Sequence, residues 1–102
     1  MILIRFNIGL GGEIVGFNIS GHGNKIVCAA VSALAINAIN SIEKLTHTHF
    51  SCDYENERFI DFHLTDKPDA NTRLLLESLR LGVRSIADEH FNDVVIEEIL
   101  LQ

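Results

Sequence analysis

The amino-acid sequence predicts an α+β fold, with a mainly antiparallel sheet, two helices on one face and the element order ββαββαβ. Several short segments alternate apolar and polar residues, which is the period of half-buried strands. Two longer segments instead repeat apolar residues every three or four positions, as amphipathic helices do. With 102 residues, 47% of them hydrophobic, the chain is expected to form one domain, 1–102, with its own core.

Five segments are expected to be strands. Apolar residues occupy every second position from Ile2 to Ile8, the glycines of "GLGGE" suit a hairpin turn, and "EIVGFNIS" continues to about Ser20. "THTHFSCDY" and "RFIDFHL" predict a second hairpin, joined by the polar turn "ENE" at 55–57. The last strand is "DVVIEEILL", residues 93–101, and this strand is a candidate edge for contact with a second copy.

The two helices are expected over residues 26–44 and 69–87. The apolar stripe of the first comprises Val27, Val31, Leu34, Ala38, Ile42 and Leu45, and that of the second Leu75, Leu79, Val83 and Ile86. The longest apolar stretches fall short of a membrane span, and the opening segment lacks the features of an export signal. We therefore expect a cytoplasmic protein that does not bind membranes.

Charge and cysteine content narrow the partners. A net charge of -6 argues against a nucleic-acid partner, which would require a basic patch. Asp88, Glu89, Asp93, Glu97 and Glu98 form an acidic end, either a solvated face or a surface that attracts a basic substrate. The two cysteines, without an export signal, are expected to be free thiols.

The segment "GHGNKIVCAAVSAL", residues 21–34, carries the candidate site. Cys28 lies at a predicted helix start, where unpaired N–H groups and the helix dipole favour a thiolate and could stabilise an oxyanion. His22, between Gly21 and Gly23, can transfer a proton near neutral pH. The six-residue separation spans at most about 20 Å, so contact is allowed but not required. The alternative is a thiol that only packs in the core.

Gly21-His22 and "IVCAAVSAL", residues 26–34, resemble the ribosomal-processing cysteine proteases of the Prp family. The resemblance implies a small homodimeric protease that removes an N-terminal extension from a large-subunit ribosomal protein. It implies that Cys28 is the nucleophile and His22 the general base, and no cofactor or metal is expected. Ser32 matches a family serine; it lies one turn beyond Cys28, where it could bond near the thiolate or to its own backbone carbonyl.

This chain also departs from the family pattern. The loop between His22 and Cys28 is shorter than usual, and Lys25 stands where the family usually has an acidic residue. A lysine favours a nearby thiolate and disfavours a nearby imidazolium. Two alternatives to a protease therefore stay open: a non-catalytic dimeric module that binds a peptide or the ribosome, and a redox-sensing thiol protein.

The remaining histidines raise the alternative of a zinc site. His47 and His49 lie two apart on a predicted strand, and Cys52 or His63 could join them. However, the sequence has no Cys-x-x-Cys, and a regular strand would place Cys52 on the face opposite His49. We expect no metal site, and an exposed strand face instead.

Overall fold

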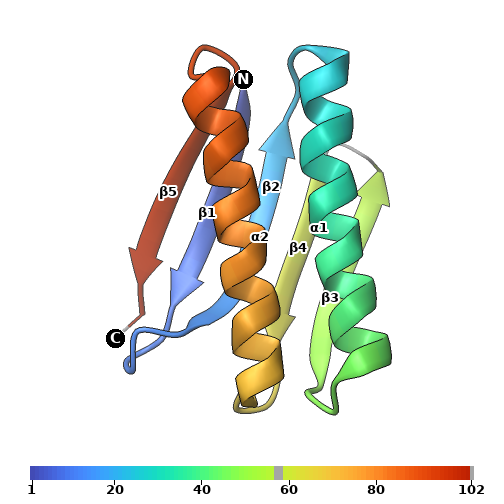
Figure 1. Ribbon diagram of the computed structural model, residues 1–102, viewed down its shortest axis with the longest axis vertical. Helices are drawn as coiled ribbons and strands as arrows, with labels where there is room; N and C mark the ends of the chain where they lie inside the picture. The colour runs from blue at the N-terminus through green and yellow to red at the C-terminus, as the bar shows by residue number, and fades with distance from the viewer. Residues whose placement is uncertain (57–58, 102) are drawn as a thin grey trace.

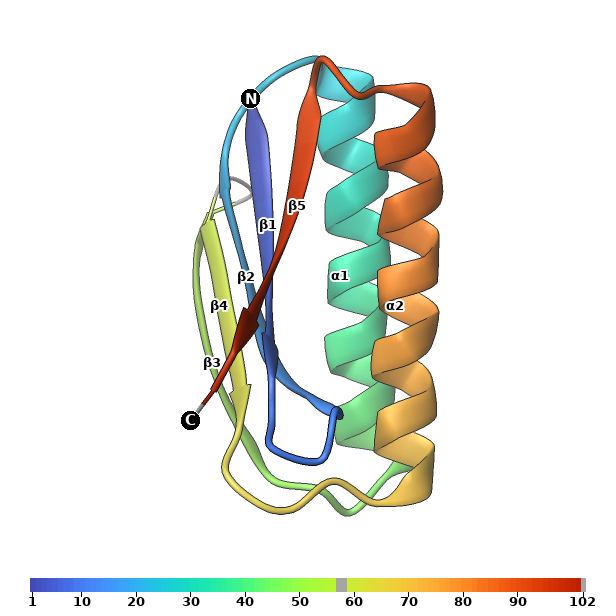
Figure 2. The same ribbon diagram turned by 90° about the vertical axis from the view of Figure 1, so that its left-hand side faces the viewer.

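The computed structural model describes residues 1–56 and 59–101, which form a sheet with two helices side by side on one face (Figures 1 and 2). The predicted order ββαββαβ is confirmed. The elements are β1 (Ile2–Ile8), β2 (Ile14–Gly21), α1 (Lys25–Leu45), β3 (Phe50–Asn56), β4 (Phe59–Leu64), α2 (Ala70–Glu89) and β5 (Val94–Leu100).

The five strands lie in the order β3-β4-β2-β1-β5, so β3 and β5 are the edges. Three neighbouring pairs are antiparallel, and β5 pairs in parallel with β1, opposite Ile2 to Ile8. The sheet is therefore mainly antiparallel, as predicted, with one parallel pair. The cause is the α2 crossover, which returns the chain to the end of the sheet from which β4 started.

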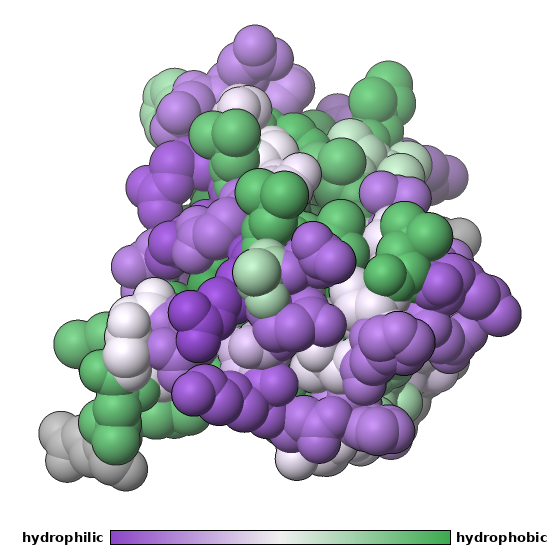
Figure 3. Space-filling model, turned by 60° about the horizontal axis from the view of Figure 1, so that its bottom comes forward, coloured by the Kyte–Doolittle hydropathy of each residue, from purple (hydrophilic) through white to green (hydrophobic). Residues whose placement is uncertain are grey.

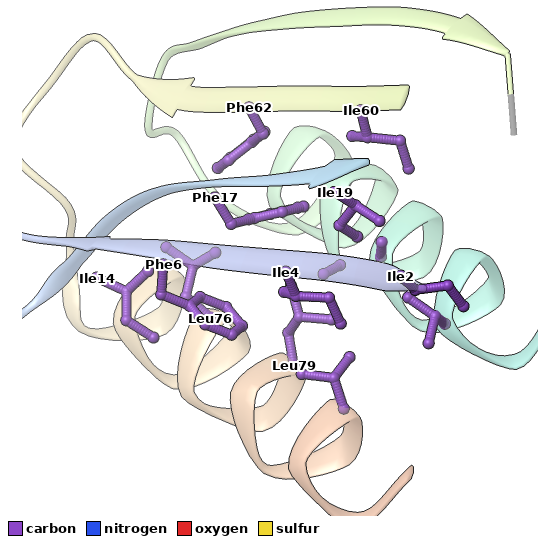
Figure 4. Close-up of a cluster of buried hydrophobic side chains, with 14 of the residues drawn as sticks. Ile2, Ile4, Phe6, Ile14, Phe17, Ile19, Ile60, Phe62, Leu76 and Leu79 are labelled. Atoms are coloured by element: carbon purple, nitrogen blue, oxygen red, sulfur yellow. The ribbon is translucent and has the colours of Figure 1, made fainter. Parts of the chain in front are cut away.

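The core lies between the sheet and the helices. β1 alternates buried and half-buried residues along its whole length, which confirms its predicted period. Phe17 stacks on Phe62 with ring centroids 5.0 Å apart, and Phe50 lies at the same distance on the other side of Phe62. Figure 4 shows Phe6 and Ile4 of β1 beside Leu76 and Leu79 of α2. This packed core holds the strand ends, and therefore the loops that follow them, in place.

The predicted stripe of α1 is mostly confirmed. Val27, Val31, Ala38 and Ile42 are buried, and Leu34 is half-buried. Leu45 was predicted wrongly, because it is the last residue of the helix and is 70% exposed. Ala35, which is fully buried, was not predicted. Its small side chain suits the contact of the helix with the sheet.

The stripe of α2 is shifted by part of a turn. Leu79 and Val83 are buried as predicted, whereas Leu76 is the fully buried residue and Leu75 is only partly buried. The buried Thr72 donates its hydroxyl hydrogen to the hydroxyl oxygen of Thr48, 2.8 Å away. A polar residue can occupy this core position because its partner is also polar.

Two other expectations need correction. β3 continues through Asn56, so Glu55 and Asn56 of the predicted turn are strand residues, while residue 57 lies outside the described residues.

By length and mean hydropathy alone, α1 would be long enough to cross a membrane. Asparagines and serines interrupt its apolar runs, but the helix remains apolar on average. In the fold one side of α1 packs on the sheet. Viewed from the bottom, the apolar surface is broken up by polar side chains (Figure 3).

Candidate active site

The predicted site lies where β2 leads into α1, at the upper end of the molecule in Figure 1. Gly21 ends β2 with a φ of 86°, a left-handed conformation that favours glycine. A β-carbon at Gly21 would also collide with the carbonyl oxygen of Met1 on the neighbouring strand. Gly21 is thus the residue that allows the chain to leave the sheet and turn toward α1.

The short loop after Gly21 is hydrogen-bonded to the N-terminus of the chain and lies near Asp93. The amino group of Met1 donates a hydrogen bond to the carbonyl oxygen of His22. A β-carbon at Gly23 would lie 3.8 Å from a carboxylate oxygen of Asp93 and 3.9 Å from the side chain of Ile2. The backbone carbonyl of Asp93 in turn accepts from the amide of Ile2, at 2.8 Å. His22 itself is exposed, so its backbone is anchored while its ring faces solvent.

Asn24 defines the start of the helix. Its side-chain oxygen accepts from the amides of Ile26, at 2.9 Å, and Val27, at 3.4 Å, and its carbonyl accepts from Cys28, at 2.9 Å. The expectation of unpaired amides around Cys28 is therefore wrong, because the cap satisfies them. Within residues 1–56 and 59–101, no acceptor is found for the amides of residues 23–25. Donors without a found acceptor thus lie at the junction of the loop and the first helical residue, Lys25.

The sequence reasoning missed Asn24, although the signal was present. An Asn directly before an apolar helical pattern is a typical N-cap. It moves the helix start one residue earlier than predicted, so that Cys28 is the fourth helical residue. This position gives Cys28 a paired amide and a side chain that points sideways from the first turn.

Lys25, Cys28 and Ser32 share one face of α1, because residues three and four apart are neighbours on a helix. Cys28 is half-buried and packs against the edge of the core, and Lys25 is exposed. A positive side chain therefore stands one turn before the thiol. Ser32, half-buried, stands one turn after it. The structure brings to this end of the molecule all the predicted site residues: Gly21, His22, Gly23, Lys25, Cys28 and Ser32.

The second cysteine is in a different setting. Cys52 is half-buried on β3. Burial raises the pKa of its thiol, and the carboxylates of Asp53 and Asp61 raise it further. This thiol stays protonated near neutral pH and is a poor nucleophile.

The histidines considered for zinc do not form a metal site. β3 begins at Phe50, so His47 and His49 precede the strand rather than lie on it. The ring of His49 lies 2.6 Å from a carboxylate oxygen of Asp66, to which its amide also donates. Among the described residues, no group of three or more metal-ligating side chains converges.

The acidic residues near the C-terminus separate into two groups. Glu97 pairs with Arg5 at 3.1 Å, and Glu98 pairs with Arg80 and Arg84. In the described part of the chain, none of the ion pairs involves Asp88, Glu89 or Asp93. These three carboxylates flank the end of α2 and the loop to β5, on the side of the molecule where α1 begins. The uncompensated negative charge is therefore close to the candidate site.

The sequence model of the cysteine protease Prp family matches residues 1–95, which include the whole candidate site. The chain belongs to the cysteine protease Prp family. This membership confirms the predicted enzyme class, cysteine protease. No curated protein matches the chain.

Solved structures share the Prp fold over almost the whole chain. The ribosomal processing protease Prp from Staphylococcus aureus, with a covalently linked product peptide, gives a TM-score of 0.90 at 21% identity, covering 96% of this chain and 99% of that one. The same S. aureus protease with a substrate peptide gives 0.89 at 20% identity, with the same coverage. SMU.848 from Streptococcus mutans gives 0.82 at 27% identity and covers 99% of both chains.

Proposed function

We propose that this Prp-family protein is a cytoplasmic endopeptidase that removes the N-terminal extension of a large-subunit ribosomal protein. Its nucleophile is Cys28 and its general base is His22. The observation that carries the proposal is the family match, which includes Gly21-His22 and "IVCAAVSAL" in a strand–loop–helix context. The S. aureus protease of the same fold, a ribosomal processing protease, forms a covalent link with its product peptide.

The proposed reaction has two stages. The imidazole of His22 accepts the thiol proton of Cys28, and the sulfur attacks the scissile carbonyl carbon. The oxyanion that forms is bonded by amides from residues 23–25, since the amides of Ile26, Val27 and Cys28 already have acceptors. The C–N bond then breaks, the leaving amine takes the proton from His22, and a thioester remains on Cys28. Water, deprotonated by His22, attacks the thioester and releases the carboxylate and the thiol.

Lys25 is the departure from the family pattern that lies nearest to this scheme. It is an exposed cation on the same face of α1 as Cys28, one turn before it, where a family carboxylate would place the opposite charge. The backbone of His22 is held by a hydrogen bond from the amino group of Met1 to its carbonyl oxygen.

We propose further that the protein is a homodimer, as the family resemblance implies. β5 supports this proposal because it is an edge strand with apolar residues on the surface. Val95 is 38% exposed, Ile99 40% and Leu100 74%. An edge strand of this kind is a natural site for pairing with a second copy.

The experiment that tests the proposed activity is cleavage of the organism's own ribosomal-protein N-terminus by the purified protein, followed by mass spectrometry. Cys28→Ala should abolish cleavage and the thioester intermediate, and His22→Ala should lower kcat by about 10²–10⁴-fold. Cys52→Ala and His63→Ala are matched controls, because Cys52 is on β3 and His63 on β4, outside the site. Both controls should cleave normally.

Two outcomes would contradict the proposal. If the native protein binds the peptide without cleaving it, the non-catalytic binding module is correct instead. If it neither cleaves nor binds, but Cys28 is reversibly oxidised by dilute peroxide, the redox-sensing thiol protein takes its place.

A further inference from the structure

A cleft of about 270 Å³ opens between the first turn of α1 and the last turn of α2. Figure 1 shows these two helix ends side by side at the same end of the molecule. The cleft is lined by Ile26, Val27 and Ala30 from α1, and by Ser85, Ile86, Glu89 and His90 from the end of α2. Its walls are mostly apolar, and its polar groups come from one side.

We propose that this cleft is a peptide subsite, which binds a large apolar side chain with a lysine or arginine next to it, about three residues from the scissile bond. The inference rests on the proposed function and adds a substrate preference to it. Size, position and charge support it independently.

The size of the cleft matches one side chain. A cavity of about 150 Å³ is known to hold a benzene-sized group, whereas pockets for whole small molecules begin at about 300 Å³. The cleft, at 270 Å³, lies between these two values. Ile26, on its wall, is 81% exposed. An apolar ligand side chain would cover this surface, which the protein itself leaves open.

The cleft and the thiol lie on different sides of the same helix turn. An α-helix has about 3.6 residues per turn, so Ile26 and Ala30 share a side, and Cys28, midway between them, points the other way. A β-carbon at Gly82 of α2 would lie 2.9 Å from the side chain of Leu34, one turn beyond Ala30, so the cleft side of α1 faces α2. A peptide bound at both places must therefore pass around the start of α1.

This path sets the spacing in the substrate. A helix with its side chains is about 10–12 Å across, and an extended peptide advances about 3.3–3.6 Å per residue. About three residues therefore separate the side chain in the cleft from the carbonyl that Cys28 attacks. The loop amides of residues 23–25 lie along this path, at the start of the helix.

Charge determines the neighbour of the apolar residue. Glu89 lines the cleft, and in the described part of the chain it takes part in no ion pair. Lys25, the cation of this region, stands on the Cys28 side of α1 instead. A peptide with a basic residue next to the bound apolar one is complementary to this arrangement.

The test uses adjacent alanines of α1. Ala30→Leu fills the cleft, whereas Ala29→Leu adds the same atoms to an exposed position that does not line it. Both changes are placed on the Cys28→Ala background, so that binding is measured without cleavage. The probe is a positional-scanning peptide library, read out by fluorescence anisotropy. We expect the parent to select an apolar residue beside Lys or Arg, and Ala30→Leu to weaken that binding about tenfold or more, the value of burying one large side chain.

A second pair of variants tests the basic neighbour. Glu89→Gln should remove the preference for Lys or Arg, and Asp88→Asn, which removes the same charge outside the cleft, should retain it. Alkylation of Cys28 by iodoacetamide in the otherwise native chain should be equal in all four variants. Equal alkylation excludes a loss of fold or of the catalytic turn.

The outcomes separate the two proposals. If the ribosomal N-terminus is cleaved equally well by native protein and Ala30→Leu, the proposed function holds and the subsite is overturned. If nothing is cleaved but Ala30→Leu weakens peptide binding selectively, the subsite holds and the protease claim fails. Selection of no apolar-basic pair from the library would also overturn the subsite.

Discussion

At the scale of single residues, Gly21 determines where the loop that carries His22 leaves the sheet. Its left-handed φ and its close approach to Met1 are separate requirements, and each excludes a side chain. The chain contains a natural comparison, because Gly12 has nearly the same φ, 85°, but a β-carbon there would meet no atom within 4 Å. Comparing the two glycines therefore separates the cost of the left-handed conformation from the cost of the steric contact.

Gly12→Ala should therefore lower the free energy of unfolding by about 1–2 kcal/mol, the cost of a left-handed alanine. Gly21→Ala should lower it further, because the new methyl group also displaces Met1 and the His22 backbone bonded to it. Urea unfolding of both variants measures the difference. Equal losses would show that the Met1 contact gives way without cost.

The candidate residues of the site could be named from the sequence, whereas their supporting contacts could not. Spacing alone left a packing thiol open for Cys28, and the roles of His22 and Cys28 remain predictions that the family resemblance implies. Asn24 could also have been found, as an Asn before a helix. The hydrogen bond from the Met1 amino group to the His22 carbonyl oxygen joins residues 21 positions apart, since 22 − 1 = 21. Local patterns carry no information on such contacts.

At the scale of elements, the cap of α1 fixes the first turn, which carries Cys28 and one wall of the cleft. A single side chain, Asn24, accepts from two amides there. The cap therefore influences both stability and the orientation of Cys28. The predicted helix faces were less accurate than the predicted helices. Periodicity gives an average direction, whereas the actual burial of α2 depends on Thr48, which comes from a distant connection.

Asn24→Ala should destabilise the protein by about 1 kcal/mol, the usual cost of losing an N-cap. Asn40→Ala is the matched control, because Asn40 is exposed in the interior of the same helix, where alanine is the better helix former. In thermal unfolding, Asn24→Ala should have a lower Tm than the native protein, and Asn40→Ala should have a higher one. An unchanged Tm for Asn24→Ala would mean that water replaces the hydrogen bonds of the cap.

The connection between β4 and α2 should respond to acid. Hydrogen bonds from the His49 amide and ring lower the pKa of the Asp66 carboxyl below its ordinary value of 3.8. A lowered pKa stabilises the fold at pH values above 3.8, and this stabilisation is lost as the pH falls through the lower folded value. In Asp66→Asn, the free energy of unfolding should therefore fall less steeply than in the native protein as the pH is lowered. In Asp88→Asn, which removes a carboxylate outside these hydrogen bonds, it should fall as steeply as in the native protein.

At the scale of the whole molecule, the mixed sheet follows from the helix crossovers and leaves β5 at an edge next to β1. The element order was predictable because each element has its own period. The strand order was not, because it depends on which distant strands pair. The face of the sheet opposite the helices and the edges at β3 and β5 are the surfaces of the sheet that no helix covers.

If two copies meet at β5, Ile99→Asp should convert the dimer into a monomer, because it places an unpaired charge in the contact. Leu10→Asp is the control, since Leu10 is 87% exposed in the connection between β1 and β2. Sedimentation velocity gives the mass of each variant. A native protein that sediments as a monomer at micromolar concentration would contradict the homodimer.

The raised pKa of Cys52 has a practical consequence for work with this protein. Near neutral pH that thiol stays protonated, so, if Cys28 is the nucleophile proposed above, a mild fluorescent haloacetamide should label Cys28 in preference to Cys52. The ratio of dye to protein then counts the molecules with a reactive Cys28, without removing any cysteine. Specific activities from different purifications can thus be normalised to these molecules rather than to total mass.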